Sequence, residues 1–264
     1  MSFQDSQGVL NETRYTQPCM VAFAVGVTQI LADEGIRPDY VAGLSLGEYS
    51  ALQAAGVFNP QQAISLVAFR GKVMAEAAKG VPCGMTAVLG LDREKLEQAC
   101  EQASSLGVVA IANYNCPGQL VIGGHQAAVD EAARLAKEMG ARRCMPLKVS
   151  GPFHTPLLKP AGDALAEKFK GETFGEMQVP VLFNCLGREK GENDTIPALL
   201  ERQVQSSVYM EDTIRRLAEL GVDTIVEIGP GKVLSGFVRK TTPDIKTYAV
   251  ETVADVQALV QALK

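Results

Sequence analysis

The sequence predicts an α/β protein whose parallel-sheet core carries a second, inserted unit. Two observations lead to this prediction. Before residue 81 and again after residue 148, short apolar strands alternate with amphipathic helices, which is the rhythm of parallel α/β construction. Between these stretches the order of strands and helices changes. A chain of 264 residues is long enough for one large domain that carries a smaller one.

The first stretch, 1–80, begins with a polar segment and then forms helices around one short strand. A helix is expected from Thr16, because Pro18 falls in its first turn, where the missing N–H of proline is harmless. The expected elements are a helix at 16–34, a strand at 39–44, and helices at 46–56 and 60–77.

The middle stretch, 81–148, alternates differently. Its expected elements are a strand at 84–90, a helix at 92–105, strands at 108–114 and 119–123, a helix at 126–139 and a strand at 142–148. This β-α-β-β-α-β order is the split βαβ arrangement of ferredoxin-like folds. We therefore predict a ferredoxin-like inserted subdomain at 81–148, with 1–80 and 149–264 forming the α/β core.

The last stretch, 149–264, returns to the core pattern. Its expected elements are a helix at 156–169, a strand at 180–184, a long helix at 196–219, a strand at 223–228, a helix at 232–240, a strand at 246–250 and a helix from 253. The segment "EIGPGKVLSG" at 227–236 is glycine-rich, but Val226 stands where a phosphate-binding P-loop needs glycine. It also lacks the G-x-G-x-x-G spacing of dinucleotide sites, so a tight strand-to-helix turn is expected.

Composition and charge exclude several classes of function. A net charge of −5, without Trp, argues against nucleic-acid binding, which needs a basic surface and aromatic side chains for stacking. The longest apolar run, 20–27, is too short to cross a bilayer, and no basic-then-apolar leader precedes it. We expect no nucleic-acid or membrane partner and a cytoplasmic location.

The six cysteines and two histidines do not form a metal-binding or disulfide pattern. The cysteines are scattered without a C-x-x-C pair, as expected of reduced and mostly buried thiols. Only His125 and His154 could supply imidazole ligands. We therefore predict that the protein binds no metal.

The segment 43–47, Gly-Leu-Ser-Leu-Gly, fits the G-x-S-x-G pattern of a nucleophile elbow. In such an elbow the glycines relieve crowding at a sharp strand-to-helix turn, and the serine hydroxyl is exposed. The backbone N–H of the next residue, here Leu46, would then stabilise a developing oxyanion. Ser45 is thus a candidate nucleophile, with a structural Gly-Ser turn as the alternative.

A serine needs a base to become a useful nucleophile. His125 stands at the start of an expected helix, where a solvated capping role is the simpler interpretation. His154, in "VSGPFHTPLLKP", lies where the chain returns to the core, and a junction of two units is a usual place for a site. His154 is therefore the candidate base. Its orienting partner is either an aspartate or a backbone carbonyl.

Arg70, in "AFRGKVM", lies on a helix face with apolar neighbours. It could be a snorkelling or ion-paired arginine. It could instead be a clamp for a substrate carboxylate, because the guanidinium fork binds carboxylates with two hydrogen bonds.

Together these segments resemble the malonyl-CoA:acyl carrier protein transacylase family. The resemblance runs along nearly the whole chain in the family's order and spacing. The matching segments are "TQP" at 16–18, "GLSLGEYSAL" at 43–52, "RGKVM" at 70–74, "NYNCPGQLVIGGH" at 113–125, "GPFHTPLLKPA" at 151–161 and "VEIGPGKVL" at 226–234.

The resemblance implies a hydrolase-like α/β core with a ferredoxin-like insertion and a ping-pong mechanism. Ser45 would attack the thioester of malonyl-CoA, and His154 would act as base and then as acid, held by a backbone carbonyl near Gln203. Arg70 would bind the malonyl carboxylate. The acyl group would pass from the serine ester to the phosphopantetheine thiol of acyl carrier protein, in fatty acid or polyketide biosynthesis. The CoA thioester is a substrate, and no cofactor is implied.

Three more residues match positions of the family that contact substrate. Phe153, just before His154, resembles the malonyl-preferring form of the loop; family members that accept methylmalonyl tend to carry serine there. Asn113 and Asn115 match positions that line the substrate cleft.

The chain departs from the family pattern in two places. Leu44 stands where many members have histidine, a variation that the family tolerates. The family also begins with a strand and a Gly-Gln-Gly loop that supplies a second oxyanion donor, and this sequence starts after them. Loss of one such donor can lower the rate about 10²–10³-fold. We expect the natural chain to be longer, with a truncated fragment of impaired activity as the alternative.

Two other functions use the same residues. A thioesterase would release the acyl group from Ser45 to water, although a fixed charge at Arg70 suits malonyl alone. A truncated, non-catalytic fragment would bind CoA or carrier protein without turnover.

Overall fold

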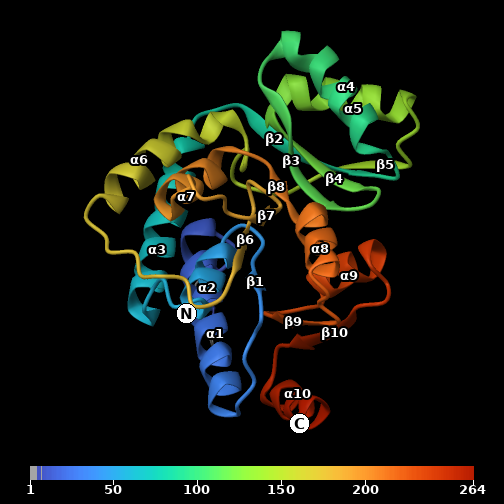
Figure 1. The fold of residues 1–264 in the computed structure, drawn as a ribbon. Helices are drawn as coiled ribbons and strands as arrows, with labels where there is room; N and C mark the ends of the chain where they lie inside the picture. Colours follow the sequence, from blue (N-terminus) through green and yellow to red (C-terminus); the bar gives the residue numbers. More distant parts are fainter. Residues whose placement is uncertain (1–4, 7) are drawn as a thin grey trace.

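The computed structural model describes residues 5–6 and 8–264, which form a mixed α/β fold (Figure 1). Within these residues the strands form a three-stranded sheet, β1-β6-β7, a two-stranded sheet, β10-β9, and a five-stranded sheet, β5-β2-β4-β3-β8. The five-stranded sheet lies at one end of the molecule, under α4 and α5 (Figure 1). α8 and α9 also contact this sheet, at β3, and α9 packs against β9 and β10 as well.

The described residues before position 81 form three helices and one short strand. They are α1 (Thr13–Asp33), β1 (Val41–Ala42), α2 (Gly47–Ala54) and α3 (Pro60–Ala77). α3 begins where the sequence predicts, with Pro60 in its first turn and the Asn59 side chain accepting from Gln62 N at 2.8 Å. α1 packs against α3 through a face spaced three and four residues apart. Among the described residues α1 is the one helix long and apolar enough to cross a membrane, a test that core helices also pass.

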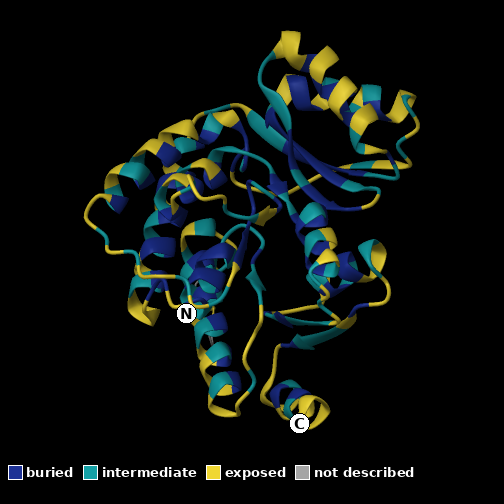
Figure 2. Ribbon diagram, viewed as in Figure 1, coloured by how far each residue is buried: buried dark blue, intermediate teal, exposed yellow. Residues whose placement is uncertain are grey.

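The middle of the chain forms most of the five-stranded sheet. Its elements are β2 (Cys83–Leu89), α4 (Arg93–Ala103), a 3₁₀ turn (Ser104–Leu106), β3 (Val109–Cys116), β4 (Gln119–His125), α5 (Gln126–Glu138) and β5 (Arg143–Pro146). The pairs β2–β4, β2–β5 and β3–β4 are antiparallel. Both helices bury their apolar faces on the sheet, in a core cluster that includes Leu96, Ile122 and Val129. Figure 2 shows the exposed residues on the opposite faces of these helices.

The last part of the chain contains the remaining elements. They are a 3₁₀ turn (Pro156–Leu158), α6 (Lys159–Phe169), β6 (Val181–Phe183), β7 (Arg188–Glu189), α7 (Ile196–Gln205), β8 (Val208–Tyr209), α8 (Met210–Glu219), β9 (Thr224–Ile228), α9 (Val233–Thr241), β10 (Lys246–Val250) and α10 (Val253–Leu263). β7, which pairs antiparallel with β6, has no counterpart in the sequence prediction.

The predicted long helix at 196–219 is wrong. It is divided into α7 and α8 by β8, which pairs in parallel with β3 through Asn113 and Val208. Two consecutive serines lie at the break. The Ser206 hydroxyl donates to a carbonyl of α7 while its backbone is extended, and the Ser207 hydroxyl donates to Ile111 O at 2.7 Å. Such local hydroxyl bonds compete with the helical backbone pattern.

The parallel pairs that the α/β pattern predicts are β1–β6 and β9–β10. The register pairs Val41 with Val181 and brings the ends of β1 and β6 side by side. Within the described residues β1 pairs only with β6, and β9 only with β10. β1 and β9 therefore each have one edge without a strand neighbour in that part of the chain.

The glycine-rich segment 227–236 is the strand-to-helix turn that the sequence predicts. It connects β9 to α9, and the buried Glu227 carboxylate accepts from Leu234 N at 2.9 Å and Ser235 N at 2.7 Å. A carboxylate at a helix N-terminus satisfies backbone donors that have no partner within the helix. Two backbone donors at the start of α9 are therefore already paired with an acidic side chain.

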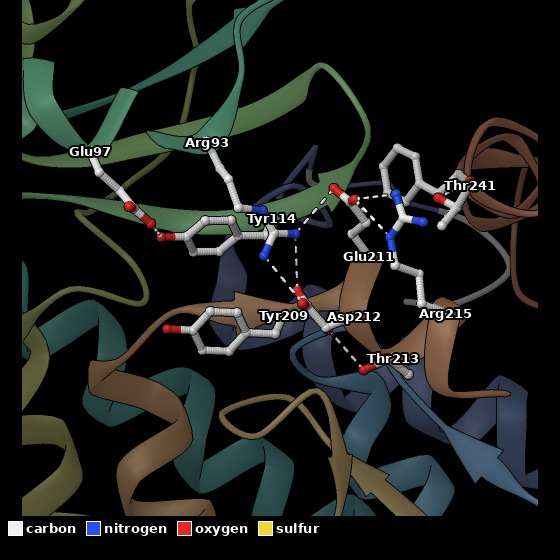
Figure 3. Close-up of polar contacts among 10 residues, drawn as sticks. Arg93, Glu97, Tyr114, Tyr209, Glu211, Asp212, Thr213, Arg215 and Thr241 are labelled. Carbon is white, nitrogen blue, oxygen red and sulfur yellow. Dashed lines mark hydrogen bonds and ion pairs between the residues drawn. The ribbon is translucent and has the colours of Figure 1, made fainter. Parts of the chain in front are cut away.

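An ion-pair network joins the five-stranded sheet to α8 (Figure 3). Arg93, in the first turn of α4, donates to Asp212 Oδ1 at 3.1 Å and Oδ2 at 3.2 Å, and pairs with Glu211 at 3.3 Å. Its guanidinium lies over the ring of Tyr114, which stacks on Tyr209 with centroids 4.9 Å apart. These contacts hold α4 and β3 against the segment that carries β8.

We predict that Arg93→Ala lowers the free energy of unfolding by about 1 kcal/mol, the upper end for partly exposed ion pairs. It removes a bidentate pair and leaves two carboxylates close together. Arg134→Ala is the matched control, because Arg134 pairs with Glu131 and Glu138 on the surface of one helix. Urea unfolding of both variants measures the difference, and equal losses would contradict the prediction.

Candidate active site

Ser45 lies at the sharp turn between β1 and α2, in a left-handed backbone conformation with φ +55°. The turn requires glycine at position 43, whereas a Cβ at Gly47 would meet no neighbouring atom within 4 Å. A Cβ on Gly43 would lie 2.0 Å from the backbone carbon of Gly47, so no larger residue fits. A left-handed conformation costs a non-glycine residue of order 1–3 kcal/mol, and such strain is concentrated at functional sites. The G-x-S-x-G segment therefore forms the elbow that its pattern predicts.

Ser45 Oγ lies 2.8 Å from His154 Nε2. The other ring nitrogen, Nδ1, lies 2.9 Å from the backbone oxygen of Gln203. A carbonyl oxygen only accepts, so Nδ1 carries the proton and Nε2 is free to accept from the serine hydroxyl. The arrangement is a serine–histidine pair oriented by a backbone carbonyl, one of the two alternatives left open by the sequence.

His154 is buried, and its backbone is also left-handed, with φ +60°. In the described residues Ser45 and His154 are the non-glycine residues with positive φ. Burial, together with the positive charge of Arg70, lowers the pKa of His154 to about 4. The imidazole is therefore neutral at physiological pH, the state that a general base needs.

Arg70 lies on α3 with its side chain fully buried. It donates to Gln17 Oε1 at 2.7 Å, to Gln203 Oε1 at 2.9 Å and to Ser45 Oγ at 3.0 Å. It makes no ion pair with a carboxylate of the described residues, and its Nε has no acceptor there. Burial lowers the pKa of Arg70, yet a guanidinium stays protonated in proteins. Both structural alternatives, snorkelling and ion pairing, are therefore wrong.

The two glutamine side chains around Arg70 complete its environment. The Gln203 side chain also donates to Ser45 O at 2.7 Å, so it links the nucleophile to the arginine. Gln17 is a residue that the sequence analysis missed as a site residue. A signal was present, because Gln17 is an amide on the same face of α1 as Val21 and Ala24, which are buried. A buried amide on an apolar face requires a polar partner.

The other predicted site residues lie on the elements around this pair. Leu46 is the N-cap residue of α2, and its N–H has no backbone or side-chain acceptor in the described part of the chain. Phe153 packs against both the core cluster around α3 and the cluster of Met85 and Ala112. It therefore lies at the junction of the core and the five-stranded sheet.

Asn113 and Asn115 lie on β3. Asn113 is half-buried and pairs with Val208, whereas Asn115 is buried and its Oδ1 has no partner among the described residues. Among the described residues neither side chain hydrogen-bonds to Ser45 or His154, and their roles stay predictions.

The capping role predicted for His125 is wrong. The residue ends β4 and precedes α5, but its side chain makes no capping bond. Its Nδ1 accepts from Val108 N at 2.9 Å, because the pairing of β3 with β4 brings that donor beside the ring.

The family described as "Acyl transferase domain" matches residues 3–258. This chain belongs to that family. Similar proteins include the malonyl CoA-acyl carrier protein transacylases of Bacillus subtilis, 41% identical over 99% of this chain and 83% of that protein, and of Haemophilus influenzae, 40% identical over 96% of this chain and 82% of that protein.

Solved structures of the family have the same fold. An MCAT from Streptococcus pneumoniae superposes with a TM-score of 0.93 at 46% identity, covering 98% of this chain and 85% of that one. The malonyl-transacylase PlMCAT, solved with the type II PKS acyl-carrier protein AntF, gives a TM-score of 0.94 at 38% identity, covering 98% of this chain and 84% of that one.

We predict that the burial of His154 makes the folded protein less stable in mild acid. An unfolded histidine takes up its proton near pH 6.5, whereas folded His154 does so near 4. As the pH falls between these values the unfolded state binds more protons, so stability decreases, by at most about 2 kcal/mol from pH 7 to pH 5.

Urea unfolding at both pH values, in the wild type and in His154→Gln, isolates this contribution. The wild type should lose more stability than the variant on acidification. An equal loss in the two proteins would show that His154 is not held neutral by the fold.

Proposed function

We propose that this protein transfers a malonyl group from malonyl-CoA to the phosphopantetheine thiol of acyl carrier protein through a malonyl-Ser45 ester. The proposal is carried by one observation. Ser45 Oγ, at 2.8 Å from His154 Nε2, also lies 3.0 Å from a buried arginine that has no carboxylate partner in the described residues. The names of the relatives support the same reaction.

In the first half-reaction Ser45 Oγ attacks the thioester carbonyl while His154 Nε2 takes the hydroxyl proton. The imidazolium keeps its Nδ1–H on the carbonyl of Gln203, 2.9 Å away. The tetrahedral oxyanion is stabilised by Leu46 N–H at the start of α2. Collapse breaks the carbon–sulfur bond, and CoA leaves as a thiol with the proton from His154.

The second half-reaction reverses these steps with a different thiol. His154 removes the proton of the carrier-protein thiol, and the thiolate attacks the ester carbonyl. Ser45 leaves with the proton returned by His154. The chemistry uses the thioester of malonyl-CoA, the thiol of the carrier protein and the side chains of this chain, without a cofactor.

Arg70 gives the site its preference for a dicarboxylic acyl group. A buried cation without a counterion is energetically costly, and an incoming carboxylate supplies that counterion. Its Nε, which has no acceptor in the described residues, is available for the malonyl carboxylate. Phe153 supports malonyl rather than a branched acyl chain by filling space beside His154.

We also propose that the fold consists of a hydrolase-like core, 1–80 and 149–264, with a ferredoxin-like insertion at 81–148. The strand order β5-β2-β4-β3 and the separate cluster under α4 and α5 support this division. The parallel pairs β1–β6 and β9–β10 support a hydrolase-like core.

We predict that brief incubation with malonyl-CoA adds one malonyl group to the wild type and none to Ser45→Ala. Intact-mass spectrometry measures the adduct. Its fate identifies the reaction class, because an adduct stable in water but removed by carrier protein is that of a transferase. Rapid loss to water would indicate a thioesterase, and no adduct on folded protein would indicate a binding function.

We further predict that Arg70→Ala lowers kcat/KM for malonyl-CoA about 10- to 100-fold, because one charge-assisted hydrogen bond contributes about 1.5–3 kcal/mol. Transfer of acetyl, which has no carboxylate, should be spared or increased. Arg70→Lys keeps the positive charge but loses the two-pronged guanidinium. Its kcat/KM for malonyl-CoA should therefore lie between those of the wild type and Arg70→Ala. An unchanged malonyl-to-acetyl ratio in folded Arg70→Ala would remove Arg70 from substrate selection.

A further inference from the structure

Asn184 uses all of its polar groups, and both side-chain bonds go to the nucleophile turn. The residue follows β6 and is 2% exposed. Its Oδ1 accepts from Ser45 N at 2.6 Å, and its Nδ2 donates to Gly43 O. One side-chain amide thus bridges the turn from the residue two before the nucleophile to the nucleophile itself.

The backbone of Asn184 is fixed from two further elements. Its N–H donates to Glu48 Oε2 at 2.6 Å, and its carbonyl accepts from Tyr209 N in β8 at 2.9 Å. Glu48 is fully buried in the first turn of α2, directly after the elbow. Asn184 is therefore bonded to the elbow through its side chain and, through its backbone N–H and Glu48, to α2, the helix that follows the elbow.

These contacts act on a backbone that would otherwise relax. The left-handed φ of Ser45 persists only where the surroundings over-determine it. Asn184 holds Ser45 N and Gly43 O, while Gln203 holds Ser45 O. A rotation of the backbone at Ser45 would carry Cβ and Oγ away from His154 Nε2, so these bonds determine where the hydroxyl points.

We propose that Asn184, held by Glu48, is a positioning residue that keeps Ser45 in its reactive backbone conformation during acyl transfer. The proposal rests on the proposed function, because it requires Ser45 to be the nucleophile. Neither side chain touches the substrate, and both act through Ser45. An asparagine is needed because the turn presents a donor, Ser45 N, and an acceptor, Gly43 O. A side-chain amide can pair with both, since it carries an acceptor oxygen and a donor nitrogen.

Two variants of Glu48, Glu48→Gln and Glu48→Ala, differ in whether they keep the acceptor for Asn184 N. Burial raises its pKa to about 8, so the carboxyl group is mostly neutral at pH 7. Glutamine keeps the oxygen that accepts from Asn184 N in a neutral group of the same shape. Alanine removes that acceptor and leaves the buried N–H of Asn184 unpaired.

The experiment measures the single-turnover rate of Ser45 malonylation by intact mass, across a series of malonyl-CoA concentrations. The variants are Asn184→Ala, Asn184→Asp, Glu48→Ala and Glu48→Gln, with Asn193→Ala as the control at an exposed asparagine. A nucleophile displaced by about 1 Å can lose on the order of 10²-fold in rate. We expect Asn184→Ala to acylate 10- to 100-fold more slowly at saturation, with a half-saturating concentration within about twofold of wild type.

The conservative variants Asn184→Asp and Glu48→Gln distinguish a loss of Ser45 positioning from a loss of folding stability. Asn184→Asp keeps the acceptor for Ser45 N but loses the donor to Gly43 O, and we expect an intermediate rate. Glu48→Gln should recover most of the rate lost in Glu48→Ala. Circular dichroism and thermal unfolding establish that each variant is folded, and the Glu48 pair carries the test where the Asn184 variants do not fold.

Wild-type acylation rates in folded Asn184 variants, or in Glu48→Ala, would overturn the inference. So would a loss confined to the half-saturating concentration. If the wild type acylates and Ser45→Ala does not, these results leave the proposed function intact. A folded wild type that forms no adduct would instead remove the proposed function, and the inference with it.

Discussion

The site depends on holding two strained residues face to face. Ser45 and His154 both have left-handed backbones, and their side chains meet at 2.8 Å. Neither conformation is favourable for a residue with a side chain, so the rest of the structure has to impose it. Gly43 lets the chain pass close to the backbone of Gly47. Gln203 contacts both strained residues: its carbonyl accepts from His154, and its side-chain amide donates to Ser45 O. The precision of the site is therefore a property of its backbone.

A second constraint is electrostatic. Arg70 brings a full positive charge into a region where His154 has to stay neutral and Ser45 has to lose a proton. Arg70 serves both needs. Its charge lowers the pKa of the His154 imidazole, and it lies beside Ser45 Oγ, the oxygen that becomes negative. Amides, rather than carboxylates, surround Arg70 within the described residues, so its charge is solvated without being neutralised.

The order of helices and strands could be predicted because periodicity and turn residues are local. Ser45 and His154 could be found from a short motif and from the scarcity of histidines. The long helix at 196–219 could not be corrected from sequence, since its break depends on the pairing of β8 with β3, which is distant in sequence. Glu48 and Asn184 were missed for the same reason, whereas Gln17 could have been found as an amide on an apolar helix face. Asn184 reaches Ser45 only because the register of β1 on β6 aligns two segments about 140 residues apart, and no spacing encodes that meeting.

β8 is only two residues long, yet it gives the five-stranded sheet a third attachment. The strands β2 to β5 join the rest of the chain before Cys83 and after Pro146, and two connections alone would leave a line about which these strands could turn. The pairing of β3 with β8, supported by the Arg93 ion pairs, fixes a point away from that line. The same strand donates to the carbonyl of Asn184. β8 therefore connects the five-stranded sheet, through β3, to the asparagine that holds the backbone of the nucleophile.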